Sequence, residues 1–96
     1  MNEQQKADVR VFMDNMRIQL ENNEWKDGWE ECETSFLLEQ FRNKVHTINQ
    51  ICDASIIQSL DKYPDLKTTI EFLQKTLADL ANYAMMISGN VGRSIK

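Results

Sequence analysis

The sequence has few of the residues that interrupt helices. Its 96 residues include one proline, Pro64, and three glycines. No stretch shows the apolar–polar alternation, bounded by turns, that is typical of a half-buried strand. These absences predict an all-α protein, a helical bundle of three to four helices per chain. A chain of this length can bury only a small core, so we expect dimerisation to complete it.

Cysteine, histidine and basic charge are also scarce. Cys32 and Cys52 are too few for a disulfide framework, and with the single His46 they form no zinc motif. The net charge of −4 argues against binding along a DNA or RNA backbone, which requires a basic patch. No apolar run approaches the ~20 residues of a membrane span, and there is no signal-peptide pattern. We therefore expect a cytoplasmic protein that does not bind membranes.

Apolar residues at helical spacing predict three main helices in a single domain, residues 1–96. The first covers residues 3–22, the second begins at Thr34 or Ser35, and the last runs from about Leu66 to Ser88. Residues 1–3 and 91–96 are expected to fray, because Gly89-Asn90 is a typical helix end. The second helix either continues past Cys52 or breaks at residues 53–55, and we prefer the break. A loop is expected around Pro64.

The segment 75–87 is apolar almost all the way round, which predicts a helix buried on most sides. It nevertheless carries Asp79 and Asn82, which lie three residues apart and therefore share a face. A carboxylate in such a place needs a metal, a cation or a set of hydrogen-bond donors as its partner. The identity of that partner is the functional question for this chain.

The connector after the first helix contains two tryptophans, Trp25 and Trp29, in a polar stretch. Gly28 in this stretch can take a positive φ at little cost. The interpretation we favour is that the indoles close the end of the core. Alternatively, an indole with Lys26 beside it forms one wall of a ligand pocket.

Four segments follow one another in a distinctive order: Phe12-Met13-Asp14-Asn15-Met16, Trp25-Lys26-Asp27-Gly28-Trp29, Phe36-Leu37-Leu38-Glu39-Gln40-Phe41-Arg42 and Ala78-Asp79-Leu80-Ala81-Asn82-Tyr83-Ala84-Met85-Met86. Together they resemble the small phage-type MazG-like nucleoside triphosphate pyrophosphohydrolases. In that family the second segment contains Lys-Gly-Gly-Trp, and the fourth has the sequence Ala-Asp-Val-Ala-Asn-Phe-Ala-Met-Met. The resemblance implies a helical pair that dimerises into a four-helix core, in a protein of phage origin working in the host cytoplasm.

In active members of the family, Glu-Glu-x-x-Glu on one helix and Glu-x-x-Asp on another hold Mg²⁺. The metal bridges the phosphates of an NTP, and a metal-activated water cleaves it to NMP and pyrophosphate. Here the first three acids are replaced by Asn43, Lys44 and Thr47, and the fourth by Thr76. Of the expected acids only Asp79 remains. A single carboxylate provides too few protein ligands for a Mg²⁺ site. We therefore expect no metal and no other cofactor.

We therefore predict that Lys44 replaces the metal and that its ammonium pairs with Asp79 across the helix interface. In the alternative, Lys44 extends to solvent and Asp79 bonds to Asn82 or Thr76. His46 is expected to be a surface or packing residue rather than a ligand.

Three functions are compatible with this pattern. The first is a catalytically impaired MazG-like protein that sequesters or senses a nucleotide without hydrolysing it, with candidate ligand residues Lys26, Trp29, Lys44, Asp79, Asn82 and Tyr83. The second is an active Mg²⁺-dependent NTP or dNTP pyrophosphohydrolase with a rearranged metal site, built from Glu39, Glu71, Asp79 and either Glu30 or Glu33. The third is a helical interaction module that inhibits a host protein through Val11, Ile18 and Tyr63. In each case we expect a homodimer or higher homo-oligomer.

Overall fold

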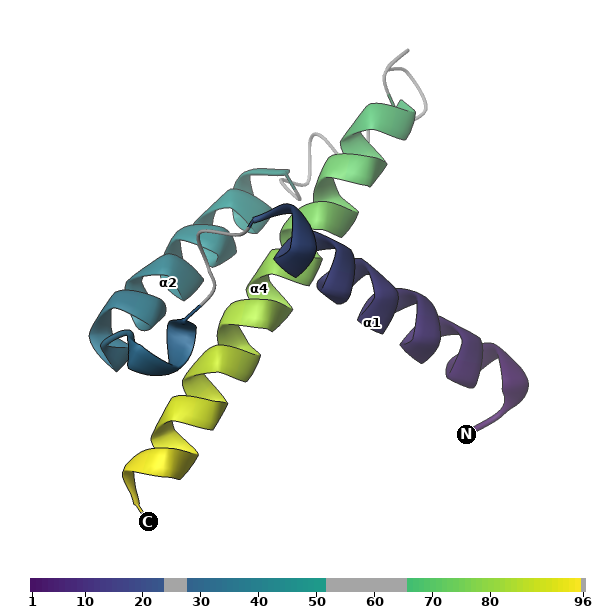
Figure 1. Ribbon diagram of the computed structural model, residues 1–96. Coiled ribbons are helices and arrows are strands. Elements are labelled where there is room, and N and C mark those ends of the chain that lie inside the picture. Colours follow the sequence, from purple (N-terminus) through teal and green to yellow (C-terminus); the bar gives the residue numbers. More distant parts are fainter. Residues whose placement is uncertain (24–27, 52–65, 96) are drawn as a thin grey trace.

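Every regular element in the described part of the chain is helical. The computed structural model describes residues 1–23, 28–51 and 66–95. Helix α1 spans Glu3–Asn22, the 3₁₀ turn η2 spans Trp29–Glu31, helix α2 spans Thr34–Ile51 and helix α4 spans Leu66–Ser94 (Figure 1). The all-α prediction is confirmed. The predicted break at residues 53–55 and the loop around Pro64 lie outside the described residues.

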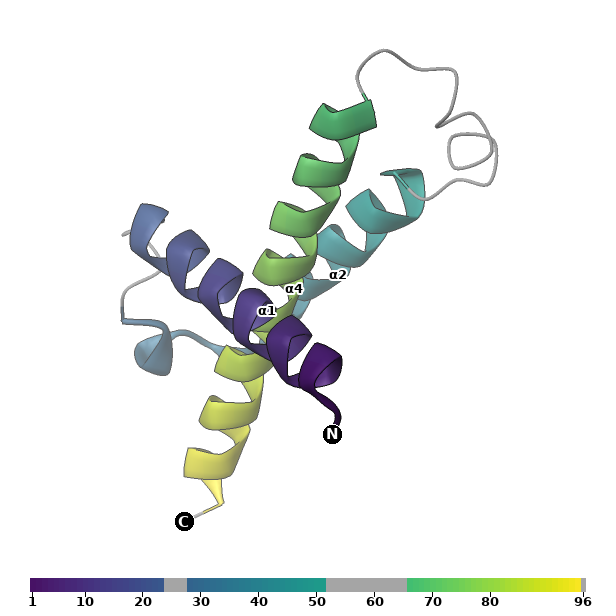
Figure 2. The ribbon, with the colours of Figure 1, turned by 90° about the vertical axis from the view of Figure 1, so that its right-hand side faces the viewer.

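Helix α4 is the central element. Figures 1 and 2 show α1 crossing one side of α4 while α2 runs along another, and both pack on α4 more than on each other. The radius of gyration is 15.6 Å, whereas a compact domain of this length has about 12–13 Å. The three helices therefore form an elongated, open arrangement rather than a closed bundle. None of these helices has the length and apolar character needed to span a membrane.

A capping box defines the start of α1. The Asn2 side chain accepts a hydrogen bond from the Gln5 amide at 2.8 Å, and the Gln5 side chain accepts one from the Asn2 amide at 2.9 Å. This exchange satisfies two backbone N–H groups that a helix start would otherwise leave unpaired. The helix therefore begins at Glu3, as predicted, and Asn2 caps it.

The start of α2 lies where the sequence predicts it, at Thr34. Thr34 is the first helical residue, and the backbone carbonyl of Glu33 accepts hydrogen bonds from the amides of Phe36 and Leu37. Gly28, in the connector before it, has a φ of +82° as expected. Residues 24–27 of this connector, including Trp25 and Lys26, lie outside the described residues.

The predicted end of the last helix at Gly89-Asn90 is wrong, because α4 continues to Ser94. The Asn90 amide group donates to the carbonyl oxygens of Trp29 at 3.0 Å and Cys32 at 3.3 Å, and its oxygen accepts a hydrogen bond from Arg93. These contacts hold the η2 segment against α4. Asn90 therefore serves as a tertiary anchor within the helix and not as its terminal residue.

Within the described residues, the fully buried apolar core is small and consists of Leu37, Ala78, Tyr83 and Met86. Leu20, Trp29, Phe41 and Ile87 are partly buried against it. Most of segment 75–87 is buried or half-buried, as expected, and its exposed residues are Lys75, Leu77, Ala84 and Met85. The other described residues therefore leave part of the apolar face of α4 uncovered.

Candidate functional site

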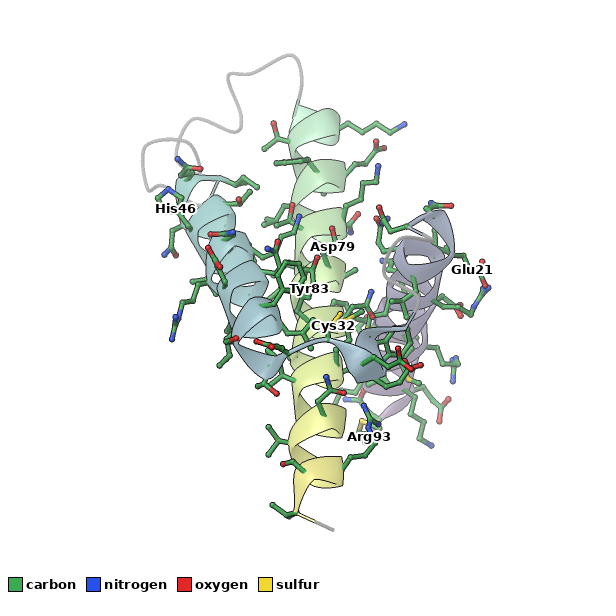
Figure 3. The ribbon with its side chains drawn as sticks, turned by 60° about the vertical axis from the view of Figure 1, so that its left-hand side comes forward. Glu21, Cys32, His46, Asp79, Tyr83 and Arg93 are labelled. Atoms are coloured by element: carbon green, nitrogen blue, oxygen red, sulfur yellow. The ribbon has the colours of Figure 1, made fainter. Side chains whose placement is uncertain are left out.

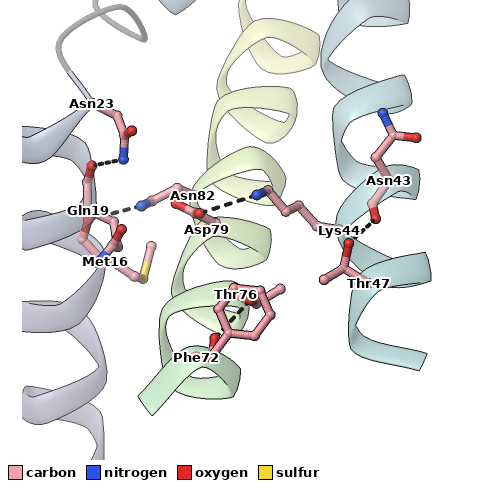
Figure 4. Close-up of polar contacts among 10 residues, drawn as sticks. All are labelled: Met16, Gln19, Asn23, Asn43, Lys44, Thr47, Phe72, Thr76, Asp79 and Asn82. Atoms are coloured by element: carbon pink, nitrogen blue, oxygen red, sulfur yellow. Dashed lines mark hydrogen bonds and ion pairs between the residues drawn. The ribbon is translucent and has the colours of Figure 1, made fainter. Parts of the chain in front are cut away.

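The predicted pairing of Lys44 with Asp79 is confirmed. Lys44 Nζ on α2 lies 3.5 Å from Asp79 Oδ2 on α4 (Figure 4). The side chain of Lys44 is 33% exposed and that of Asp79 is 14% exposed, so the pair lies at the edge of the helix interface. Partial burial reduces screening by water, and the contact is therefore stronger than one on an open surface.

Thr76 and Asn82 use their side chains elsewhere. The buried Thr76 hydroxyl donates to the carbonyl oxygen of Phe72 at 2.8 Å, within its own helix. Asn82 Nδ2 donates to the Met16 carbonyl oxygen on α1 at 2.9 Å (Figure 4). Because Lys44 Nζ lies 3.5 Å from Asp79 Oδ2, the alternative in which Lys44 extends to solvent away from Asp79 is excluded.

Asn82 is the most deeply placed of the candidate ligand residues, with an exposed fraction of 0%. Its Oδ1 atom has no hydrogen-bond partner among the described residues. A buried amide oxygen without a partner costs about 1–3 kcal/mol. In this arrangement Asn82 joins α1 to α4, and its side chain is buried. Its ligand role stays a prediction.

Tyr83 and Trp29 belong to the core. Tyr83 is 2% exposed and packs with Leu37 and Met86, and Figure 3 shows it with Asp79 between α2 and α4. Burial raises the pKa of the Tyr83 phenol, and the Asp79 carboxylate raises it further. Trp29 packs against this cluster. This contact agrees with our favoured interpretation, that the two indoles close the core, for Trp29 alone, because Trp25 and Lys26 lie outside the described residues.

The described residues do not fit a magnesium site. No three His, Cys, Asp or Glu side chains within residues 1–23, 28–51 and 66–95 gather closely enough to hold a metal. Glu30, Glu33, Glu39 and Glu71, the acids considered for a rearranged site, are all exposed. His46 is exposed as well, as expected for a surface residue. Asp79 itself already faces a cation.

A polar depression of about 270 Å³ lies between α1 and α4. Its walls carry three carboxamides and two opposite charges, from Asn15, Gln19, Gln74, Glu71 and Lys75. Lys75 precedes Asp79 by one helical turn, so the two side chains share a face of α4. Sequence reasoning missed Gln19 and Lys75, since only the crossing of α1 over α4 brings them together.

No protein-family model, curated protein or solved structure matches the chain. In its described part the chain is an all-α protein with a partly buried Lys–Asp pair between α2 and α4 and a polar depression between α1 and α4. The resemblance to the MazG-like family rests on the residue pattern, and it remains a prediction.

Proposed function

We propose that this protein binds a nucleotide without hydrolysing it, as a MazG-like protein in which an ion pair replaces the metal site. The observation that carries the proposal is the 3.5 Å contact between Lys44 and Asp79. An ammonium group has three N–H donors. With a third of its side chain exposed, Lys44 can donate to a phosphate oxygen while it still faces Asp79.

The polar depression supports the same proposal. Lys75 adds a second cation one turn from Asp79, and Gln19 and Asn15 bring carboxamide groups from α1. A carboxamide both donates and accepts hydrogen bonds, as recognition of a nucleobase edge requires. The ligand phosphates then lie toward the two lysines and the base lies toward the amides.

The described acids also favour binding over hydrolysis. Mg²⁺ needs carboxylates beside the substrate phosphates, and here the single matched carboxylate, Asp79, is paired with Lys44. A nucleotide held in this way is sequestered or sensed. The resemblance to phage-type proteins supports a phage source and a role in the host cytoplasm.

The proposal includes a homodimer. Among the described residues, four apolar side chains are fully buried, while large apolar side chains on all three helices are exposed. A core of this size rarely stabilises a small domain by itself. A second copy of the chain would cover more of this surface and complete the core.

The test is calorimetry against a panel of mono-, di-, tri- and cyclic nucleotides, with EDTA present. We expect metal-independent binding that Lys44→Met weakens about tenfold or more, since one charge-assisted hydrogen bond is lost. Lys67→Met is the matched control, because Lys67 lies on the exposed surface of α4 beside Glu71. A parallel assay with Mg²⁺ should release no pyrophosphate from any NTP or dNTP.

Two outcomes would overturn the proposal. Mg²⁺-dependent pyrophosphate release that Asp79→Ala abolishes would identify an active hydrolase with a rearranged metal site. If calorimetry detects no heat with any nucleotide, the protein binds none of them, and the interaction module becomes the favoured function. One observation favours that second candidate: Val11 and Ile18 on α1 are exposed aliphatic residues. A stoichiometric protein partner lost with Ile18→Glu would support it.

A further inference from the structure

We infer that the surface between α1 and α4 binds a basic α-amino acid, such as free arginine or lysine. The inference goes beyond the proposed nucleotide, because it assigns a second ligand to the polar depression of about 270 Å³. Three features of the described residues carry it: a buried carboxamide with unused hydrogen-bonding groups, two opposite charges that do not pair with each other, and an adjoining apolar groove that includes a carboxylate.

Gln19 is the buried residue in the wall of the depression. It is 9% exposed and lies on the side of α1 that faces α4 (Figure 4). Its backbone carbonyl accepts a hydrogen bond from Asn23 at 2.7 Å, but its side chain bonds to none of the described residues. Burial holds this carboxamide in place while its donor and its acceptor stay unused, so it can bind a polar ligand in the depression.

Glu71 and Lys75 supply the charges of the depression. They lie one helical turn apart on α4, where a Glu followed by a Lys usually forms an ion pair. Here Glu71 instead faces Lys67 at 3.9 Å, and Lys75 forms no ion pair with the described residues. Each charge weakens the attraction of the other for a simple ion, whereas a ligand that carries both charges gains from both.

An α-amino acid has its ammonium and carboxylate groups in the required arrangement. The two groups are joined through a single carbon, and the Cβ atoms of Glu71 and Lys75 are about 5–6 Å apart at this helical spacing. One ligand can therefore place its ammonium against Glu71 and its carboxylate against Lys75. Both contacts are charge-assisted hydrogen bonds, and the Gln19 carboxamide can add a third bond to either group.

The apolar groove beside the depression fits the side chain of such a ligand. This groove, of about 200 Å³, shares Asn15 and Gln74 with the depression, so the two are continuous. Val11, Phe12 and Leu77 give the groove its apolar walls. A ligand whose charged groups lie in the depression can therefore extend its side chain along these walls.

Asp8 favours a basic side chain in this groove. It lines the groove one turn before Phe12, so the two share a face of α1. Asp8 Oδ1 accepts a hydrogen bond from Gln4 at 2.9 Å, and Asp8 forms no ion pair with the described residues. A long basic side chain can lay its aliphatic stem along the apolar walls and its cationic end between the Phe12 ring and the Asp8 carboxylate.

The test is calorimetry with arginine, lysine, leucine and glutamate. No nucleotide is present, because the proposed nucleotide also places its base toward Asn15 and Gln19. We expect arginine and lysine to bind about tenfold or more tightly than leucine, and glutamate to give no heat, since Asp8 attracts only a cationic side chain. N-acetylarginine and arginine amide each lack one charge of the α-amino acid, and each should bind about tenfold more weakly than arginine.

Substitutions of exposed residues locate the site. Asp8→Asn, Glu71→Gln and Lys75→Met should each raise the dissociation constant for arginine about fivefold or more, because each removes a charge that faces the ligand. Three matched controls remove the same charges at exposed positions that line neither groove, and they should bind arginine like wild type. These controls are Asp14→Asn, Glu21→Gln and Lys6→Met.

The outcomes separate this inference from the proposed function. Absence of heat with all four amino acids would overturn the inference and leave the nucleotide proposal, which rests on Lys44, as it stands. Arginine binding without any nucleotide binding would keep the inference and overturn the proposed function. Equal weakening by the control and site variants would overturn the site, since arginine would then respond only to the net charge of −4. Leucine binding as tightly as arginine would overturn the assignment of a basic ligand.

Discussion

At the scale of single residues, the ion pair between Lys44 and Asp79 is the feature most closely tied to sequence. Asp79 lies in a strongly apolar helix, and Lys44 is the one cation among the four positions where the predicted MazG-like pattern would have acids. A carboxylate that is 14% exposed is costly without a counter-charge, and the structure supplies one. The chain offers an internal comparison, since Arg17 and Glu21 form a pair that is well exposed on α1.

A double-mutant cycle on Lys44→Met and Asp79→Asn should give a coupling free energy of about 1 kcal/mol, since the pair is partly shielded from water. The same cycle on Arg17→Met and Glu21→Gln should give about 0.3–0.5 kcal/mol, the usual value for an exposed i, i+4 pair. Urea denaturation of the four proteins in each cycle measures both values. Equal coupling in the two cycles would contradict the role given to burial.

Stability should fall in alkaline solution because of Tyr83. Its raised pKa means that, above pH ~10, the phenol ionises in the unfolded chain before it ionises in the folded one. The contribution of Tyr83 is therefore complete below that pH and is lost as the pH rises through the folded-state pKa. Urea denaturation at pH 8 and pH 11 should show a smaller loss for Tyr83→Phe than for wild type. An equal loss in both proteins would assign the effect to other groups.

The anchoring amides lie beyond sequence reasoning. Asn82 and Asn90 donate to carbonyl oxygens of Met16 and Trp29, which are more than 60 positions away in the chain. A carboxamide that binds a distant backbone carbonyl leaves no local pattern, because almost any residue can supply the carbonyl. The pairing of Lys44 with Asp79 could be predicted because both residue types are chemically constrained. The polar depression could not be predicted, since it depends on the crossing of α1 over α4.

At the scale of elements, apolar spacing predicts the position of each described helix. The bounds of α1 agree with prediction at both ends, and α2 and α4 begin where expected. The end of α4 was missed, since Gly89-Asn90 has the composition of a helix end. The tertiary bonds of Asn90 outweigh that local preference. The apolar character of residues 75–87 was predicted, but their sequence does not reveal that Leu77, Ala84 and Met85 are exposed.

The end of α4 can be tested with its two glycines. A Cβ at position 92 would meet open space, so Gly92→Ala should stabilise the protein by about 0.5–1 kcal/mol through helix propensity. Gly89→Ala should gain less, because its Cβ would lie 3.3 Å from the Arg93 guanidinium. Thermal denaturation of both variants decides the matter. If the helix ended at Gly89, the Gly92→Ala variant would be neutral and Gly89→Ala would be strongly destabilised.

At the scale of the whole molecule, the open arrangement of helices determines how stability should depend on concentration. In the proposed homodimer, apolar side chains that are exposed on the described helices of one chain are buried between the two chains. The folded dimer is then favoured by mass action. An isolated compact domain has no such dependence.

Raising the protein concentration from about 5 µM to about 500 µM should therefore raise the Tm by roughly 5 °C or more. Differential scanning calorimetry measures the shift. A wild-type Tm that does not change with concentration would contradict the dependence of folding on association.

The central position of α4 also has a consequence for biosynthesis. Three of the four fully buried apolar residues belong to this helix, and α1 and α2 pack mainly on it. During translation the segments of α1 and α2 leave the ribosome first, with little to pack against. The nascent chain therefore folds only once α4 has been made, and until then its apolar faces are available to chaperones.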